Sequence, residues 1–180
     1  MQTQTLQRAN SMLHRYRGGV VPAASSSALA DVGDLASIAA CLPERVAEAM
    51  DAYDPRRALN RVWELVAAAN GLVDRAQPWA LYKAEKAGDT AARKALDAVL
   101  YALLEAVRLV AVHLEPFVPG ASARLLTQLS LPSAGTLPYA ERVRWGGLSD
   151  ETRTVSPAPL FPKLELSDVA SIQYGTQSGT

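Results

Sequence analysis

The sequence predicts an all-α fold, an antiparallel bundle of four to five helices followed by an extended carboxy-terminal wrap. Two observations carry this prediction. Apolar residues make up 49% of the 180 residues and are mostly Ala, Leu and Val, with few aromatics, which suits packed helices better than a sheet. Apolar positions also recur every three or four residues over several long stretches, which is the helical period. A chain of this length is expected to build one domain around one core.

The first two helical regions are separated by a short flexible connection. Residues 2–17 carry apolar side chains at helical spacing, and Gly18-Gly19 follows as a stop signal. A serine-rich stretch then precedes a second helical region at 31–42, and Pro43 is expected to start a separate short helix. The inward positions of that short helix are expected to be Val46 and Met50.

The third helix has a clear start and a clear end. Asp54 is expected to be its N-cap and Pro55 its first helical residue, because a carboxylate accepts an orphan amide there and proline has none to satisfy. Gln77-Pro78-Trp79 interrupts the pattern, since proline disfavours helical geometry in the residue before it. Trp79 is therefore expected at the entrance of another helix. The inward face of the third helix is expected to consist of Ala58, Leu59, Val62, Trp63, Val66, Ala69 and Val73.

The clearest element is a long helix at 90–114, whose apolar stripe predicts that it is the central helix. One more helix is expected at 121–129. The segment 130–165 should wrap the bundle in extended form, because Pro and Gly become frequent there. These features predict a bundle domain over residues 1–166 and a disordered tail over 167–180.

Charge and cysteine content limit the classes of partner. The 18 basic and 18 acidic side chains cancel, so no global field attracts nucleic acid or membrane, and any polyanion must be held locally. The first 30 residues nevertheless contain arginines and no acid before Asp31. Cys41 stands among apolar neighbours and is expected to be a small buried hydrophobe in a reducing compartment. No stretch approaches the roughly 18 apolar residues of a membrane helix and no secretory signal is seen, so a cytoplasmic location is expected.

The sequence contains no pattern typical of a catalytic or metal site. The common nucleotide-binding, serine-hydrolase and zinc-protease motifs do not occur, and His14 and His113 are about 100 positions apart. His113 is expected to be a partly buried imidazole, favoured by the nearby helix end, rather than a ligand. Acid pairs such as Glu44 and Glu48 have the spacing of solvated surface charges. Neither catalytic residues nor a metal or other cofactor are therefore predicted.

A polar stripe on the first helix and one tryptophan are the candidate RNA contacts. Gln4, Arg8 and Arg15 stand at i, i+4 and i+11, about three helical turns, which keeps them on one face. Amide and guanidinium groups hydrogen-bond base edges and phosphates, and arginine also stacks on unpaired bases. Trp79, beside a proline at a helix start, offers a stacking platform for a base. A solvated helix face and a core tryptophan are the plain structural alternatives.

Six strings of the sequence become informative when they are read together. They occupy residues 6–22, 53–59, 77–79, 114–119, 145–148 and 159–164, with Trp63 and Asn70 among them. Their order and spacing resemble the anticodon-binding domain of bacterial methionyl-tRNA synthetases over roughly residues 2 to 166, and the ordered set is more specific than any one string. The resemblance implies the helical bundle of the class Ia anticodon-binding domains.

The resemblance also implies a function and a set of site residues. Members of that family read the CAU anticodon of the methionine tRNA through an Asn-x-x-x-Arg pair on the first helix and the tryptophan of a Pro-Trp motif. Arg8 matches that arginine and Trp79 that tryptophan, whereas Gln4 occupies the asparagine position. Glutamine keeps the amide and adds a methylene, so either its contacts persist with shifted reach or discrimination is relaxed. The expected partner is tRNA, bound through its anticodon stem-loop.

Nothing in the sequence is similar to the family's His-Ile-Gly-His and Lys-Met-Ser-Lys-Ser signatures or to its zinc knuckle, so amino-acid activation is not expected on this chain alone. Two explanations stay open. The chain is a piece or subunit of a synthetase that works with a catalytic domain or chain, or it is a free-standing relative that binds tRNA for another purpose. A bundle that has lost RNA recognition and serves as a protein-interaction scaffold is the second hypothesis, which zero net charge and Gln4 both permit.

Overall fold

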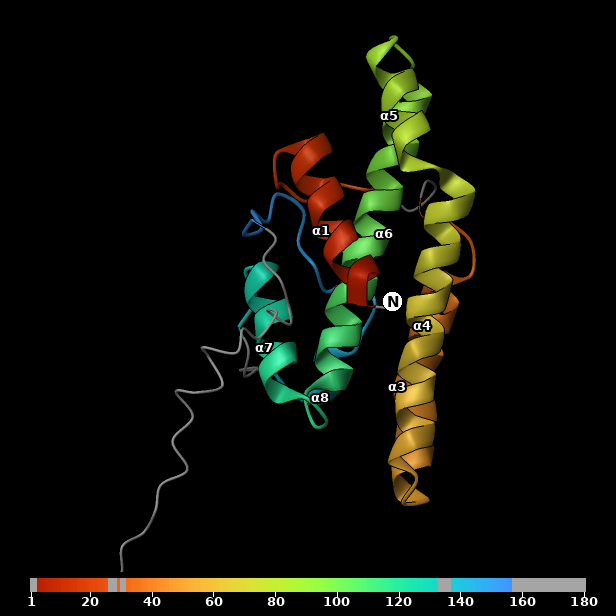
Figure 1. Ribbon diagram of the computed structural model, residues 1–180, viewed down its shortest axis with the longest axis vertical. Helices are drawn as coiled ribbons and strands as arrows, with labels where there is room; N and C mark the ends of the chain where they lie inside the picture. Colours follow the sequence, from red (N-terminus) through yellow and green to blue (C-terminus); the bar gives the residue numbers. More distant parts are fainter. Residues whose placement is uncertain (1–2, 26–28, 30–31, 133–136, 157–180) are drawn as a thin grey trace, which may run out of the picture.

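A computed structural model describes residues 3–25, 29, 32–132 and 137–156, and it shows a bundle of helices (Figure 1). The all-α prediction is confirmed: the only bridge between extended residues in this part of the chain is an isolated antiparallel one, from Val20 to Arg153. The helices are α1 (Thr3–Arg17), α3 (Leu35–Asp51), α4 (Pro55–Ala76), α5 (Pro78–Lys86), α6 (Thr90–Leu114), α7 (Pro119–Gln128) and α8 (Tyr139–Arg142).

The central helix α6 packs against α1, α3, α4, α5 and α7 and lies in the middle of the bundle (Figure 1). It begins where the sequence predicts, because the Asp89 carboxylate accepts hydrogen bonds from the amides of Ala91 and Ala92. One apolar stripe was expected, but every residue from Ala98 to Leu114 is buried. A helix enclosed on all sides is typical of a bundle centre.

The helices α3 and α4 form a long pair at one side of α6, and α3 corrects three expectations. Pro43 lies inside a continuous helix and does not start a new one. The reason is packing: the buried face continues across Pro43, so contact with α4 outweighs the lost hydrogen bond. Cys41 and Met50 are exposed, because both lie off this face. The residues that form the buried face are Leu35, Ala39, Leu42, Val46 and Ala49.

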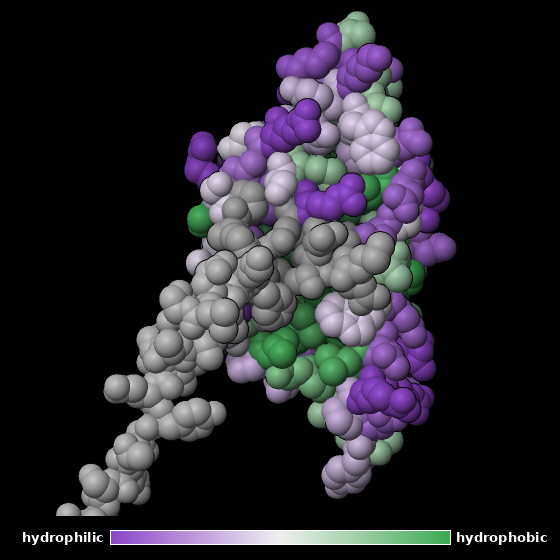
Figure 2. Space-filling model, viewed as in Figure 1, coloured by the Kyte–Doolittle hydropathy of each residue, from purple (hydrophilic) through white to green (hydrophobic). Residues whose placement is uncertain are grey.

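The turn between α4 and α5 gives Trp79 its position. The start of α4 is as predicted, since Asp54 accepts a hydrogen bond from the Arg57 amide at 2.9 Å and Pro55 follows it. Gln77 then adopts a left-handed conformation with φ 46°, and Pro78 opens α5. Only Pro78 of α5 is buried, so this helix lies on the surface of the bundle. Figure 2 shows hydrophilic residues over the end of the molecule where α5 lies and over the outer side of α3 and α4.

The closing segment, residues 137–156, runs back across the bundle. A buried ion pair on α6 holds it: Arg108 bonds both oxygens of Glu105 and donates to the carbonyl groups of Arg142 and Arg144. Glu105 in turn accepts the amides of Gly147 at 2.8 Å and Leu148 at 3.1 Å. An extended segment was expected, but residues 137–152 form the short helix α8 followed by turns and bends, and the isolated bridge from Val20 to Arg153 comes only near the end. The predicted domain end at 166 and the predicted disordered tail at 167–180 lie outside the described residues.

Candidate nucleic-acid interface

The polar face of α1 carries the predicted arginines at the surface. Arg8 and Arg15 are both exposed, and the Arg8 side chain has neither an ion pair nor a hydrogen bond among the described residues. Arg15 lies over the ring of Tyr16, with its Cζ 5.9 Å from the ring centroid. Gln4 belongs to the same helix, but its side chain lies outside the described part of the structure. The helix itself places all three positions on one face.

The closing segment forms hydrogen bonds with the inner side of α1. The buried Thr154 donates its amide to the Gly19 carbonyl at 2.8 Å, and its hydroxyl lies 3.0 Å from both Asn10 Oδ1 and His14 Nε2. The Asn10 amide donates to the Val155 carbonyl at 3.0 Å. Because these contacts use the inner side of α1, the outer side with Arg8 stays open to solvent.

The carboxyl end of α1 is joined to α5. The rings of Tyr16 and Tyr82 stack with centroids 4.6 Å apart. Arg17 bridges the helices by bonding Glu85 at 3.0 Å and Asp97 of α6 at 2.6 Å. Burial by itself would lower the pKa of the Arg17 guanidinium, but the hydrogen bonds and charges of Asp97 and Glu85 outweigh burial, so the pKa is raised. Arg17 therefore joins α1 to α5 and α6, in contrast to the exposed Arg8.

Trp79 lies in the first turn of α5 and leaves 48% of its surface exposed. Trp63, by contrast, is partly buried and packs against the core. Their difference follows from position: Trp63 lies on the inner side of a long helix, whereas Trp79 comes directly after the buried Pro78 that anchors α5. The indole of Trp79 is consequently available to a ligand.

The structure brings the helices of the predicted residues together. Figure 1 shows α1 and α5 running in the same sense, toward the end of the molecule where α5 lies. Arg8 precedes Tyr16 by about 12 Å along α1, and Trp79 precedes Tyr82 by about 4.5 Å along α5, at 1.5 Å per residue. Since Tyr16 and Tyr82 stack, both Arg8 and Trp79 come before that contact along their helices. The sequence did not indicate this stack, because residues far apart in the chain form it.

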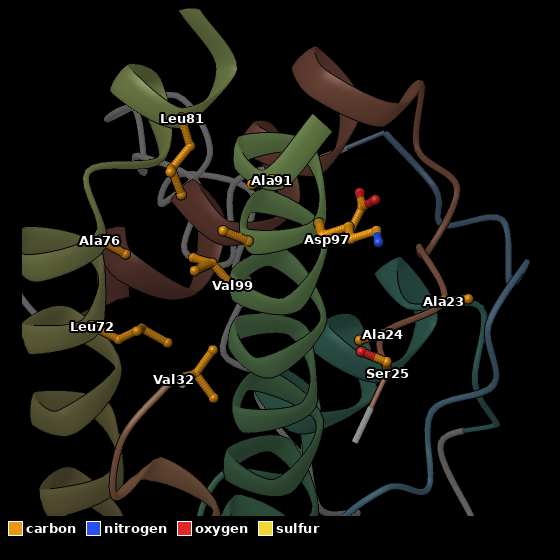
Figure 3. A pocket seen from close by; sticks show the side chains of 12 residues that line it. Ala23, Ala24, Ser25, Val32, Leu72, Ala76, Leu81, Ala91, Asp97 and Val99 are labelled. Carbon is orange, nitrogen blue, oxygen red and sulfur yellow. The ribbon is translucent and has the colours of Figure 1, made fainter. Parts of the chain in front are cut away.

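A cavity of about 860 Å³ opens between α4, α5, α6 and the segment after α1 (Figure 3). Its lining is mostly small and apolar, and Figure 3 shows Val32, Leu72 and Val99 close together on its wall. The charged residues that line it are Lys94 and Asp97, and Asp97 already bonds Arg17. Arg8, Arg15 and Trp79 are not among the lining residues, so this cavity is separate from the candidate RNA contacts.

His113 is more buried than expected, at 1% exposure. Its Nδ1–H donates to the Leu109 carbonyl at 2.8 Å, and its Nε2 has no partner among the described residues. Burial lowers the pKa of this imidazole, because a charged ring would lose its hydration there. Burial outweighs the favourable effect that the nearby helix end was expected to have on this imidazole, and His113 belongs to the core.

Two further findings concern the part of the chain that the structure describes. Its acidic, histidine and cysteine side chains do not gather in groups of three or more that could hold a metal ion. None of its helices has both the length and the apolarity needed to cross a membrane.

Comparison with known proteins identifies the family. A family model described as the anticodon binding domain of methionyl tRNA ligase matches residues 21–177, a stretch that starts after α1. The methionine–tRNA ligase of Caldanaerobacter subterraneus is 33% identical over 176 residues, covering 97% of this chain and 26% of that protein. The Enterococcus faecalis methionine–tRNA ligase is 32% identical over 171 residues, covering 93% and 24%. The chain therefore spans about a quarter of the length of these relatives.

Solved structures agree with the sequence comparison. The crystal structure of apo Mycobacterium tuberculosis methionyl-tRNA synthetase superposes with a TM-score of 0.77 at 28% identity, covering 90% of this chain and 31% of that one. The same synthetase bound by methionyl-adenylate gives a TM-score of 0.76 at 29% identity, covering 88% and 30%. From the family match over most of its length, the chain belongs to the anticodon-binding domains of the methionyl-tRNA ligases.

Proposed function

We propose that this chain binds the anticodon stem-loop of a tRNA and recognises the CAU anticodon of the methionine tRNA in support of aminoacylation. One observation carries the proposal: in a member of this family, two helices joined by the Tyr16–Tyr82 stack expose Arg8 and the indole of Trp79, each at a position before that stack along its helix. We place this activity in the cytoplasm, where translation takes place.

The chemistry of the exposed groups suits unpaired nucleotides. Arg8 is free to hydrogen-bond a base edge or stack on a base, because no acid of the described residues neutralises it. Stacking of a base on an aromatic side chain contributes about 1–3 kcal/mol, and Trp79 presents such a surface. Gln4 offers an amide one turn before Arg8 on the same helix.

Aminoacylation would need a catalytic partner. The relatives are ligases about four times as long as the aligned region, and the sequence carries none of the family's activation signatures. We therefore propose that this chain contributes tRNA binding to a synthetase whose catalytic domain lies on the same or a separate polypeptide. The alternative is a free-standing relative that binds tRNA in an accessory role or serves as a protein-interaction scaffold. The zero net charge and Gln4 both permit this alternative.

The test is a titration of the chain with tRNA that carries a CAU anticodon and with the same tRNA carrying altered anticodon bases. Arg8→Ala and Trp79→Ala should each weaken binding of the CAU tRNA by about 1–3 kcal/mol, because each removes a base contact. Arg56→Ala and Tyr53→Ala are matched controls, since both residues are exposed at the opposite end of α4, which is roughly 33 Å long. These two variants should bind like the parent chain.

Two results would contradict the proposal. Equal affinity for both tRNAs would remove the claim of anticodon recognition. Binding of a protein partner that does not change with salt, together with no tRNA binding, would favour the scaffold, because phosphate contacts make RNA affinity fall steeply as salt rises.

A further inference from the structure

We infer a second RNA-binding element beside the base contacts: a ridge formed by Arg15, Tyr16, Tyr82 and Lys86 that holds backbone phosphates of the nucleotides flanking the anticodon. The inference rests on the proposed function and extends it to residues outside the family's Asn-x-x-x-Arg and Pro-Trp motifs. The ridge consists of two stacked tyrosine rings with a cation at each end.

The ridge joins the two helices that carry the proposed base contacts. Tyr16 of α1 and Tyr82 of α5 stack with ring centroids 4.6 Å apart and planes inclined by 29°. Arg15 lies over the Tyr16 ring at 5.9 Å, and the ammonium group of Lys86 lies 5.2 Å from the centre of the Tyr82 ring. Positive charge is thus held at both ends of one continuous surface.

The positive charge of the ridge is not cancelled by its neighbours. Glu85, the acid nearest in sequence, bonds Arg17 at 3.0 Å and approaches Arg93 at 3.9 Å. Asp97 bonds Arg17 at 2.6 Å. Within the described part of the chain, neither Arg15 nor Lys86 takes part in an ion pair, and both are exposed. An anion can therefore approach them without displacing a carboxylate.

The geometry favours phosphates over bases as the ligand. The two tyrosine rings already occupy each other's faces, which leaves no ring face between them for an inserted base. Arg15 and Lys86 are exposed whereas the two tyrosines are partly buried, and an exposed ammonium is a compact charge suited to a phosphate oxygen. Trp79 is about one turn before Tyr82 on α5, so a nucleotide stacked on the indole would have its backbone near the ridge.

The experiment measures binding of the full chain to an anticodon stem-loop RNA with CAU and to one with altered anticodon bases, each over a range of salt concentrations. Lys86→Ala should weaken binding of both RNAs by about five-fold at 0.1 M salt, the effect of one phosphate contact with its released counterion. The slope of log affinity against log salt should become shallower by about 0.7–0.9. Lys86→Arg should retain both properties, and Arg56→Ala, which removes a distant exposed charge, should bind like the parent chain.

The outcomes separate this inference from the proposed function. Suppose that the parent chain prefers the CAU RNA and that Trp79→Ala weakens this binding, while Lys86→Ala leaves affinity and salt slope unchanged. The inference about the ridge is then overturned, and the proposed base contacts stand. An effect of Lys86→Ala on the CAU RNA alone would also overturn it, because phosphates carry no base identity. If the parent chain binds neither RNA, both proposals fail. Thermal unfolding of Lys86→Ala should match the parent chain, since Tyr16 and Tyr82 remain stacked.

Discussion

The helix α6 takes part in two ion-pair networks that differ in burial and in what they hold. The inner one joins Glu105 and Arg108, whose side chains are 0% and 6% exposed, to the closing segment. The outer one joins Asp97 to Arg17 and, through it, to Glu85, with exposures of 14–18%. The inner network connects parts of the core, whereas the outer one connects the helices that carry the candidate RNA contacts.

This difference shows how one helix serves both packing and binding. In the inner network the carboxylate oxygens of Glu105 each accept two hydrogen bonds, so a costly buried charge is fully compensated. A Cβ at Gly147 would lie 2.8 Å from Arg108 Cζ, so the network leaves no room for a side chain there. In the outer network the Arg17 Nη2 has no partner among the described residues. We expect the inner network to dominate stability and the outer one to contribute modestly.

The largest effect is expected from Glu105→Ala, which leaves the Arg108 charge buried and unpaired. We expect it to lower the free energy of unfolding by about 3–5 kcal/mol, measured by urea denaturation. Glu115→Ala is the control, because it breaks the pair between Glu115 and Arg142 at the end of the same helix, whose side chains are 30% and 15% exposed, and it should cost only about 1 kcal/mol. Similar losses in the two variants would contradict the contrast between a fully buried pair and a partly buried one.

A smaller effect is expected from Asp97→Ala in the outer network. We expect a loss of about 1–2 kcal/mol in the free energy of unfolding, between the values for exposed and fully buried pairs. Asp97→Asn should lose less, because its amide oxygen can still accept the hydrogen bond from Arg17 Nε. A loss as large as that of Glu105→Ala would show that the outer network is as important for folding as the inner one.

The smallest effect concerns pH and the buried His113. Burial lowers the pKa of His113 in the folded chain, so the unfolded chain binds the proton more strongly. Stability from this group is therefore complete above the ordinary value of about 6.5 and falls as the pH drops through it toward the lower folded pKa. We expect up to about 1 kcal/mol less stability at pH 5.5 than at pH 7.5. Denaturation of His113→Gln at both pH values should show a smaller difference, and an equal difference would assign the dependence to other groups.

Local signals predicted the elements of this fold more reliably than their burial. The apolar stripe at 90–114 predicted α6 correctly, since a period is a property of neighbouring residues. Continuity of α3 through Pro43 depends on contact with α4, which no local pattern reports. Glu105 and Arg108 gave one usable signal, opposite charges three residues apart inside an apolar stretch, which a buried pair would explain.

Some features of the candidate site could likewise be predicted from local sequence, and others required the structure. Helical periodicity places Arg8 and Arg15 on one face, and Pro78 predicts that Trp79 begins a helix. Arg17 belongs to the same acid-free segment, yet Glu85 and Asp97 engage it from 68 and 80 residues later in the chain. The stack of Tyr16 on Tyr82 likewise requires the packed bundle. Which arginines stay free for RNA could therefore be decided only from the structure.

The fastening of α1 by the closing segment has a consequence for biosynthesis. Asn10 and its partner Val155 are 145 residues apart. At an ordinary ribosomal rate of about 5–20 residues per second, roughly 7–30 seconds pass between their additions to the nascent chain. During that interval the inner side of α1 lacks its hydrogen bonds to Thr154 and Val155. A truncated or stalled chain never forms them. A nascent chain is therefore expected to acquire a firmly seated Arg8 only after nearly all of the described residues have been synthesised.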